Sequence, residues 1–481
     1  MTDRPAMSTP QPDATPVATG ETLGAGASVD EEAPPRPSPF RVLKNGEFRR
    51  VWVASLGSNV GGWMEFVGMQ WAMTQATLAP EWEASGRPGA PIMMGYLATA
   101  QMAPVLLMGM LGGVVADRVD RKKLLVWTQT LMMLVAAALC IEAFRGAITP
   151  ITLIVLGAIH GTVLAFNMPA WGVLTPRLVP RDQLADAIML NGLQFNLARV
   201  IGPAVGGVLL GWLGAPWMFL INTISFIGVI WAVAVTPPSP APTTAPAHPW
   251  RAIAEAFSFS FRNKGARALI LAIFLFSMLG TPLLRLMPIV VAESYKAKAD
   301  GFGLLLALMG AGAVTGALTI RLIPRWYPRH HLIPLSVMMG GLFTALTAAA
   351  PSLATSALCI YFCGIFWLWT FNPAFAALQL LVADEMRGRV MSIANVLSFG
   401  AMPLGTLLAG YIGEVASGRA GDGFGSQVGL GVNALILTVA GLVMLAWRTP
   451  EVDGLAPGQP GYDRTPGLIR GLTGSAHRGK N

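Results

Sequence analysis

A short run of charge lies between two apolar segments that are each long enough to cross a lipid bilayer. The run is Gly113-Val-Val-Ala-Asp-Arg-Val-Asp-Arg-Lys-Lys123, and the apolar segments beside it are residues 92–116 and 124–144. A helix rises about 1.5 Å per residue, so about twenty residues span the roughly 30 Å of hydrocarbon. We therefore expect two membrane-spanning helices joined by a tight turn at one membrane face.

Composition and charge agree with a membrane protein. Apolar residues make up 53% of the sequence and charged residues 12%, whereas about a quarter of a soluble domain is charged. Nearly all of the charged residues lie in the gaps between apolar segments, and the net charge of +8 forms no basic stripe. We therefore expect membrane lipids around the chain and no nucleic acid partner.

Twelve apolar segments follow one another, six on each side of a polar break. They are residues 51–77, 92–116, 124–144, 148–174, 184–213 and 217–235, then 268–292, 303–323, 332–349, 353–381, 390–415 and 428–447. This pattern predicts an all-α membrane protein of twelve transmembrane helices in two six-helix bundles.

The expected domain boundaries follow from this pattern. The N-terminal bundle is residues 46–236, and the C-terminal bundle is residues 268–448. The linker 237–267 contains an amphipathic stretch that is typical of a helix at the membrane interface. The tails 1–45 and 449–481 are rich in Pro, Gly and polar residues, so we expect them to be disordered.

Lys and Arg are distributed unevenly between the two predicted membrane faces. Most of the 33 lie in the tails and the even-numbered loops; the odd-numbered loops hold Arg87, Arg145, Lys296, Lys298 and Arg419. Because cytoplasmic loops carry the excess of positive charge, we expect a multi-pass protein of the cytoplasmic (inner) membrane with both termini in the cytoplasm.

The two halves of the chain share motifs. Phe166-Asn167-Met-Pro-Ala170 is echoed by Phe371-Asn372-Pro-Ala374, and the spacing of Asn196 with three later glycines recurs from Asn395. Two parallel six-helix repeats imply pseudo-symmetric bundles, a substrate site between them near the middle of the bilayer, and alternating access by rocking.

The charged loop resembles the loop between the second and third helices of the major facilitator superfamily. Its small residue, its first Asp and its cations match that motif, and it departs at Val119, where an aromatic is usual, and Asp120, where Gly is usual. The second acid is similar to the branch of bacterial siderophore and macrolide exporters, the transmembrane secretion effector type. The resemblance in layout covers about residues 48–447 and implies the major facilitator fold.

In that superfamily the loop latches the cytoplasmic side while the transporter faces outward. The resemblance therefore implies a gating motif made of Gly113, Asp117, Arg118, Arg121 and Lys122. From the residues alone, the cations are expected to pair with acids such as Asp384 or Glu385, or with anionic lipid headgroups. A loop that only keeps positive charge in the cytoplasm is the alternative.

The fifth apolar segment contains the motif Gly202-Pro203-x-x-Gly206-Gly207. It is similar to a fifth-helix motif that the superfamily associates with proton-driven exporters. Proline removes a helix hydrogen bond, and glycines at turn spacing leave a smooth face, so this helix can bend and pack closely between the halves. A packing face with no further role is the alternative.

Three charged residues lie inside predicted spans and are candidates for proton coupling. Glu65 lies midway along the first span, where an unpaired carboxylate is costly, and Arg199 and Arg285 are its candidate partners. The alternative for Glu65 is a permanent staple between helices. Arg199 can also be a fixed clamp, and Arg285, which follows an expected kink at Thr281-Pro282, can contact an anionic substrate group or extend to the outer surface.

Uncharged polar and aromatic residues in the spans suggest the class of substrate. They lie in helices that line the central cavity in the superfamily that the chain resembles, so the resemblance implies a set of substrate-cavity residues: Gln70, Asn167, Asn191, Gln194, Asn196, Trp367, Asn372 and Asn395. Together with Trp71, Trp369 and the many Met residues, they favour a large amphipathic organic molecule over a small sugar or an inorganic ion. Packing or contact with lipid is the alternative for each Trp and Met.

Soluble-enzyme chemistry has little support in this sequence. Cys359 and Cys363 form half a metal site at most, and His160 is alone in its span. The sequence has no phosphate-binding loop, which argues against an ATP-driven pump. We expect no enzymatic activity, no cofactor, no metal and a monomer. The sequence predicts a secondary transporter that exports amphipathic molecules of the drug or siderophore class by proton antiport. The alternatives are a proton-coupled importer on the same fold and a membrane sensor that does not transport.

Overall fold

Long α-helices build the chain in the computed structural model, which describes residues 39–237, 249–323, 327–420, 424–447 and 449–453. No strand occurs in these ranges. The helices of the first half are α1 (Gly46–Thr77), α2 (Pro80–Glu83), α3 (Ala90–Arg118), α4 (Arg121–Phe144), α5 (Pro150–Leu178), α6 (Leu184–Leu213) and α7 (Ala215–Ala234). Those of the second half are α8 (Pro249–Arg262), α9 (Lys264–Leu279), α10 (Pro282–Ile289), α11 (Ala299–Thr319), α12 (Arg329–Ala348), α13 (Leu353–Leu381), α14 (Asp384–Ala420) and α15 (Phe424–Ala446).

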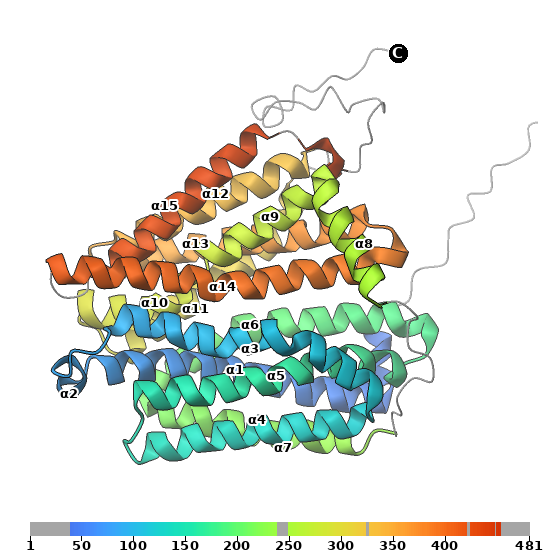
Figure 1. Ribbon diagram of the computed structural model, residues 1–481, viewed down its shortest axis with the longest axis horizontal. Helices are drawn as coiled ribbons and strands as arrows, with labels where there is room; N and C mark the ends of the chain where they lie inside the picture. Colours follow the sequence, from blue (N-terminus) through green and yellow to red (C-terminus); the bar gives the residue numbers. More distant parts are fainter. Residues whose placement is uncertain (1–38, 238–248, 324–326, 421–423, 448, 454–481) are drawn as a thin grey trace, which may run out of the picture. The chain divides into compact units, whose positions relative to one another are not determined.

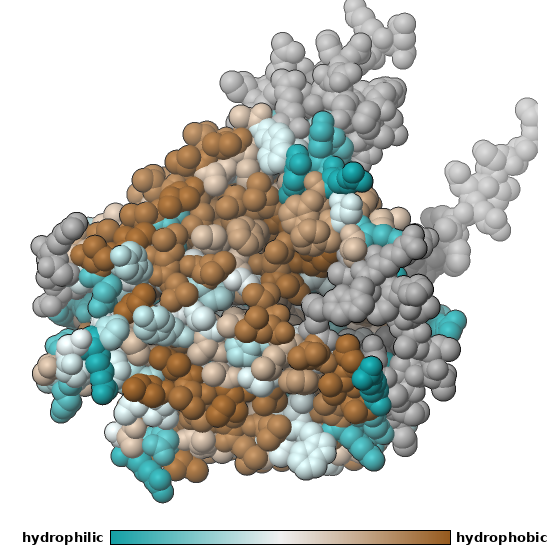
Figure 2. Space-filling view, in the orientation of Figure 1, coloured by the Kyte–Doolittle hydropathy of each residue, from teal (hydrophilic) through white to brown (hydrophobic). Residues whose placement is uncertain are grey.

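Eleven spans in the described chain are long and apolar enough to cross a membrane. The helix α1 is the twelfth long one, with 32 residues. It is not among the eleven because Gly, Ser, Asn and Gln residues and Glu65 lower its hydropathy. Figure 2 shows apolar residues over the middle of the helices and hydrophilic residues near their two ends. The chain is therefore a multi-pass membrane protein.

The seventh predicted span is interrupted where the sequence places Thr281-Pro282. Helix α9 ends at Leu279, α10 begins at Pro282, and a π-helical turn, Val290–Ser294, follows it. Proline cannot donate a backbone hydrogen bond, so it fits the first turn of a new helix. The predicted kink is confirmed, and it places Arg285 on the short helix α10.

The charged loop forms a tight turn between α3 and α4. Asp120 is the N-cap of α4, and its Oδ1 accepts from the backbone amides of Lys122 (2.9 Å) and Lys123 (3.2 Å). The buried Arg121 donates to the Ala116 carbonyl at 3.2 Å, and Lys122 Nζ donates to the Thr236 carbonyl at 2.6 Å. Asp120 thus has a structural role where the superfamily usually has Gly.

Three boundaries differ from those expected. Pro39–Lys44 is a 3-10 helix with Val42 fully buried, although the tail was expected to reach residue 45. Pro450–Asp453 is also a 3-10 helix, with Pro450 and Val452 buried. Helix α9 begins at Lys264, inside the expected linker. The rest of both tails lies outside the described residues. Helix α8 occurs where the amphipathic stretch predicts it.

The long helices run between two ends of the molecule. The end near α2 is called the α2 end, and the end near α8 is called the α8 end. At the α2 end lie the connections α1–α3, α4–α5, α6–α7 and α12–α13; at the α8 end lie α3–α4, α5–α6 and α13–α14 (Figure 1). Two helix pairs, α3 with α14 and α6 with α11, make most of the contacts between the halves, and α10 also contacts α1 and α3. These pairs define the interface between the halves.

Both interhalf contacts are tight towards the α2 end. On α3 and α14, Gly89 N donates to Glu414 Oε1 at 2.7 Å, and a Cβ on Gly410 would lie 2.4 Å from the Pro91 carbonyl oxygen. On α6 and α11, a Cβ on Gly207 would lie 2.2 Å from Gly303 Cα. These glycines are needed because any side chain would force the backbones apart.

Side chains nearer the α8 end of the same helices are exposed. Leu107 and Leu111 on α3 are 75% and 60% exposed, and Val396 on α14 is 51% exposed. Phe195 on α6 and Leu318 on α11 are exposed as well. Exposed side chains also occur towards the α2 end, such as Leu304 on α11. The glycines distinguish the two ends, because a Cβ on Gly310 would lie 3.3 Å from Val200 Cγ1, farther than the 2.2 Å from Gly207 to Gly303. The closest backbone approaches between the halves therefore lie towards the α2 end.

Candidate functional site

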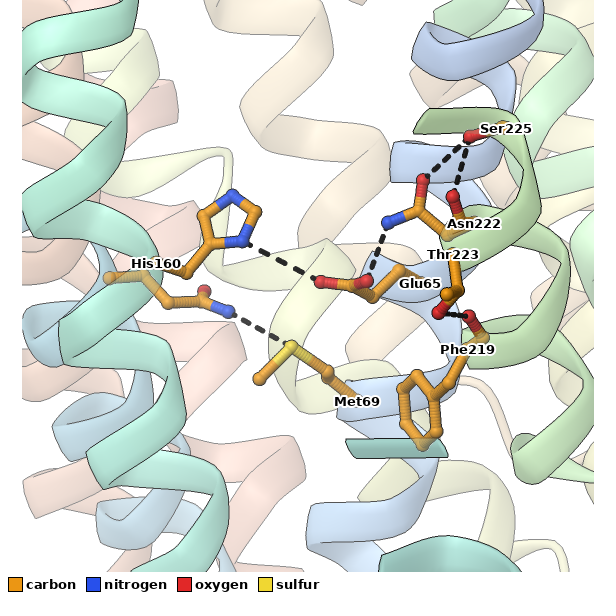
Figure 3. A network of polar contacts seen from close by, with 8 residues as sticks. Glu65, Met69, His160, Phe219, Asn222, Thr223 and Ser225 are labelled. Atoms are coloured by element: carbon orange, nitrogen blue, oxygen red, sulfur yellow. Dashed lines mark hydrogen bonds and ion pairs between the residues drawn. The ribbon is translucent and has the colours of Figure 1, made fainter. Parts of the chain in front are cut away.

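The Glu65 carboxylate is buried within the first half, on the α1 face that meets α5 and α7. Only 4% of the residue is exposed. Asn222 on α7 donates from Nδ2 to Glu65 Oε2 at 2.5 Å, and Ser225 Oγ donates to Asn222 Oδ1 at 3.2 Å. Asn222 is thereby oriented with its amide nitrogen towards the carboxylate (Figure 3). A buried carboxylate requires such a donor because burial removes its hydration.

His160 on α5 faces the other Glu65 oxygen (Figure 3). Its Nδ1 lies 3.7 Å from Glu65 Oε1 and has no hydrogen-bond partner in the described chain. At that distance the two side chains form an ion pair when the imidazole is protonated. From the sequence alone, His160 was expected to be an isolated residue. Its position inside a span, where titratable side chains are rare, was the only available signal.

Arg199, which is half-buried, and Arg285, which is buried, were expected to pair with Glu65, and the structure brings neither to it. Arg199 on α6 packs over the rings of Phe195 (5.1 Å) and Trp63 (5.9 Å), and its buried Nε has no hydrogen-bond partner among the described residues. Arg285 on α10 donates from Nη1 to Gln101 Oε1 of α3 at 2.8 Å and lies 4.9 Å from the Phe66 ring centroid. Arg285 therefore connects the two halves.

Gln70 lies one turn after Phe66 on α1. The residue is completely buried, and neither its amide oxygen nor its amide nitrogen has a hydrogen-bond partner in the described chain. Its neighbour Trp71 stacks on Phe302 of α11, with ring centroids 6.3 Å apart. Buried amide groups are rarely left unpaired, so Gln70 stands out among the expected cavity residues.

The remaining expected cavity residues are divided between structural bonds and exposed positions. Asn167 donates to Thr128 Oγ1 (2.7 Å), Asn191 to Thr175 Oγ1 (2.8 Å) and Gln194 to the Trp52 carbonyl (2.9 Å). Trp367 is in edge contact with Phe276, and its buried Nε1 has no partner among the described residues. Asn372 and Asn395 are exposed, and the Asn196 side chain lies outside the described residues. The three bonded amides therefore join helices.

The two expected motifs differ in what the structure describes of them. In the helix-bend motif, Gly202 and Gly206 of α6 meet Trp63 and Met64 of α1, Pro203 lies inside the helix, and Gly207 meets α11. In the gating motif, Gly113 lies in α3 with open space where a side chain would project, and Arg118 is exposed. The side chains of Asp117, Asp384 and Glu385 lie outside the described residues, so the expected latch pairs stay a prediction.

Comparison with known proteins places these features in a family. The family model described as transmembrane secretion effector matches residues 37–461. The staphyloferrin A transporter of Staphylococcus aureus is 24% identical over 360 residues, 74% of this chain and 87% of that protein. The enterobactin exporter EntS of Salmonella typhi is 27% identical over 349 residues, 72% of this chain and 83% of that protein.

The fold also matches solved membrane transporters. A bacterial homologue of the human lysosomal transporter Spinster, in an inward-facing and unoccupied conformation, superposes with a TM-score of 0.65 at 15% identity. The match covers 86% of this chain and 99% of that protein. At this identity the likeness concerns the fold, which is that of the major facilitator superfamily.

Proposed function

The chain belongs to the transmembrane secretion effector family of the major facilitator superfamily, and on that premise we propose that it exports amphipathic organic molecules by proton antiport. The observation that carries the proposal is the Glu65 carboxylate, buried against His160 and Asn222 with no Lys or Arg within 4.0 Å among the described residues. A buried acid that no cation neutralises is suited to gain and lose a proton.

The direction and the substrate class are supported by orientation and by relatives. The excess of Lys and Arg in the loops at the α8 end supports a cytoplasmic position for that end, so the tight contacts at the α2 end would close the outer face. A protein in this state would accept its substrate from the cytoplasm. The names of two relatives mention staphyloferrin A and enterobactin, and they favour a siderophore or a similar organic molecule as the cargo.

In the proposed cycle, binding of a proton to the Glu65 carboxylate alternates with binding of the substrate. With the outer face open, Glu65 takes a proton from outside and the substrate leaves. The protonated protein then closes outside and opens inside, where the proton leaves and the next substrate binds. The protein is expected to change conformation only with a proton or a substrate bound. Without either, the ionised Glu65 would be an unpaired charge inside the membrane, which is the costlier state.

Flux in reconstituted vesicles tests this proposal. Full-length protein in lipid vesicles would move at least one of three probes against an imposed pH gradient: enterobactin, dansylglycine as a fluorescent amphipathic anion, or ethidium as a fluorescent amphipathic cation. Glu65→Gln is expected to reduce gradient-driven flux to the level of protein-free vesicles, because the amide cannot carry the proton. The matched control is Glu142→Gln, at the end of α4, where the acid is partly exposed and pairs with Arg145 at 3.9 Å.

Two results would contradict the proposal. Gradient-driven flux that is unchanged in Glu65→Gln would remove this carboxylate from coupling. Substrate that moves in the same direction as protons would identify a proton-coupled importer on the same fold. Loss of flux in Glu142→Gln as well would mean that the assay reports stability rather than coupling.

A further inference from the structure

Arg285 is a buried cation that no acid neutralises in the described chain. The residue is 7% exposed. Its hydrogen bond to Gln101 uses Nη1, so Nε and Nη2 are left without a protein acceptor among the described residues. A buried charge is expensive unless it is paired. Two free nitrogens on one side of a guanidinium present the planar fork that a carboxylate fills with two parallel hydrogen bonds.

Gln101 fixes that guanidinium in place. Its Oε1 accepts from Arg285, and its Nε2 lies 3.4 Å from Met69 Sδ on α1. The Gln101 backbone is packed against α5, because a Cβ on Gly161 would lie 2.2 Å from the Gln101 carbonyl oxygen. Gln101 is therefore held by α1 and α5 and is a positioning residue for Arg285.

Gln70 supplies an unused amide on the same face of α1. Residues four apart on a helix differ by about 40° in direction and by about one turn in height, so Gln70 points nearly the same way as Phe66, which Arg285 covers. The next residue, Trp71, stacks on Phe302 of α11. The direction of Gln70 thus falls between α10, which carries Arg285, and α11, on the interface between the halves.

We propose that Arg285 and Gln70, with Gln101 as the positioning residue, bind a carboxylate of the transported molecule. The site rests on the proposed export function and specifies its cargo as an amphipathic organic anion. A carboxylate satisfies the free guanidinium nitrogens and accepts from the Gln70 amide. Phe66 and the stacked Trp71–Phe302 pair provide apolar surface for the remainder of the molecule. The contacts come from both halves, so binding the anion would link the halves.

Binding of a matched pair of ligands tests this assignment without requiring transport. Dansylglycine carries the carboxylate, and its methyl ester is uncharged; both report binding to the purified full-length protein by energy transfer from tryptophan. Wild-type protein is expected to bind the acid at least about tenfold more tightly than the ester, the size of one charge-assisted hydrogen bond. Arg285→Gln is expected to remove that preference and leave the affinity for the ester within about threefold.

Two further variants separate recognition from folding. Arg285→Lys keeps the charge and is expected to retain part of the preference for the acid. Gln70→Leu is expected to weaken binding of the acid by about threefold to tenfold. Its control is Gln129→Leu on α4, another buried glutamine whose Oε1 has no partner among the described residues, which should bind both ligands as wild type does.

Several outcomes would overturn the assignment. They are a wild type that binds the ester as well as the acid, an Arg285→Gln protein that keeps the preference, and an equal loss of both ligands in Arg285→Gln and Arg285→Lys. The proposed function fails separately. A protein that selects the acid through Arg285 but shows no flux driven by a pH gradient would retain the anion site and lose the antiport mechanism.

Discussion

Among the residues that the structure describes, a carboxylate pairs with a histidine in each half of the molecule, and the surroundings of the two pairs differ. In the first half, Glu65 and His160 lie 3.7 Å apart inside the helices, and His160 Nδ1 makes no hydrogen bond in the described chain. In the second half, Asp453 bonds to His330 Nδ1 at the start of α12 and also accepts from the Arg329 backbone amide at 2.6 Å. The His330 ring also contacts His331, with ring centroids 4.1 Å apart and the ring planes tilted by 42°.

The difference indicates which pair can change its protonation state during a transport cycle. Asp453 caps a helix and attaches the segment Pro450–Asp453 to α12, so its charge is part of a fixed structure. In the described part of the chain, Asn222 is the one donor to Glu65, and His160 lies beyond hydrogen-bond distance. Glu65 and His160 therefore make fewer hydrogen bonds than Asp453 and His330 do. A side chain with fewer fixed hydrogen bonds can gain or lose a proton more readily, as a proton carrier must.

The largest expected difference between the two pairs comes from replacing the histidine of each, His160 and His330. His160→Gln is expected to reduce gradient-driven export by about tenfold or more, because it removes the titratable side chain that forms an ion pair with the buried Glu65 carboxylate when the imidazole is protonated. His330→Gln should retain export within about twofold at matched protein amounts. Flux in reconstituted vesicles measures both. Equal loss of export in the two variants would contradict the distinction between the two pairs.

A smaller difference in export is expected between two buried asparagines, one in each half of the molecule. Asn222 donates to the Glu65 carboxylate, whereas Asn433 on α15 donates to the Gly405 carbonyl at 2.9 Å. Hydrogen bonds to charged groups contribute about 1.5–3 kcal/mol, and neutral ones about 0.5–1.5 kcal/mol. Asn222→Leu should therefore lower export severalfold more than Asn433→Leu. Equal export in the two variants, measured at equal reconstitution, would show that Asn222 has no special role at the carboxylate.

The sequence was sufficient for the helices but not for the partners of their charged residues. Apolar length predicts the spans, and Thr281-Pro282 predicts the break before α10, because both depend on local chemistry. The Glu65 contacts depend on which faces of α1, α5 and α7 meet, which apolar periodicity does not determine in helices that lipid surrounds on many sides. His160 was therefore missed, and Arg199 and Arg285 were assigned to the wrong neighbour in this conformation.

A stability measurement separates the second pair from the first. Asp453→Asn should lower stability by about 1–2 kcal/mol, because it weakens a helix cap and the His330 contact, and the thermal unfolding midpoint of the detergent-purified protein should fall. Export per folded molecule should be unchanged. An Asp453→Asn protein with wild-type stability but altered coupling would reverse the roles assigned to the two pairs.

The smallest effect on stability and export is expected for an exposed ion pair. Arg41 lies 3.5 Å from Asp182 and 3.6 Å from Asp186, and the Asp182 side chain is 67% exposed. Exposed pairs contribute about 0–1 kcal/mol and are screened by salt. Arg41→Gln is expected to change the unfolding midpoint and export only slightly, and less still at high ionic strength. A loss of stability as large as that of Asp453→Asn would show that exposure does not rank these pairs.

The most direct test of Glu65 as the proton carrier is proton release when substrate binds. Purified protein in weakly buffered detergent solution would receive whichever probe the vesicles transport, with a pH indicator present and a ligand-only blank subtracted. We expect wild-type protein to release protons on binding and Glu65→Gln to bind the probe without releasing any. Equal proton release by Glu65→Gln and wild type would contradict the assignment of Glu65 as the carrier.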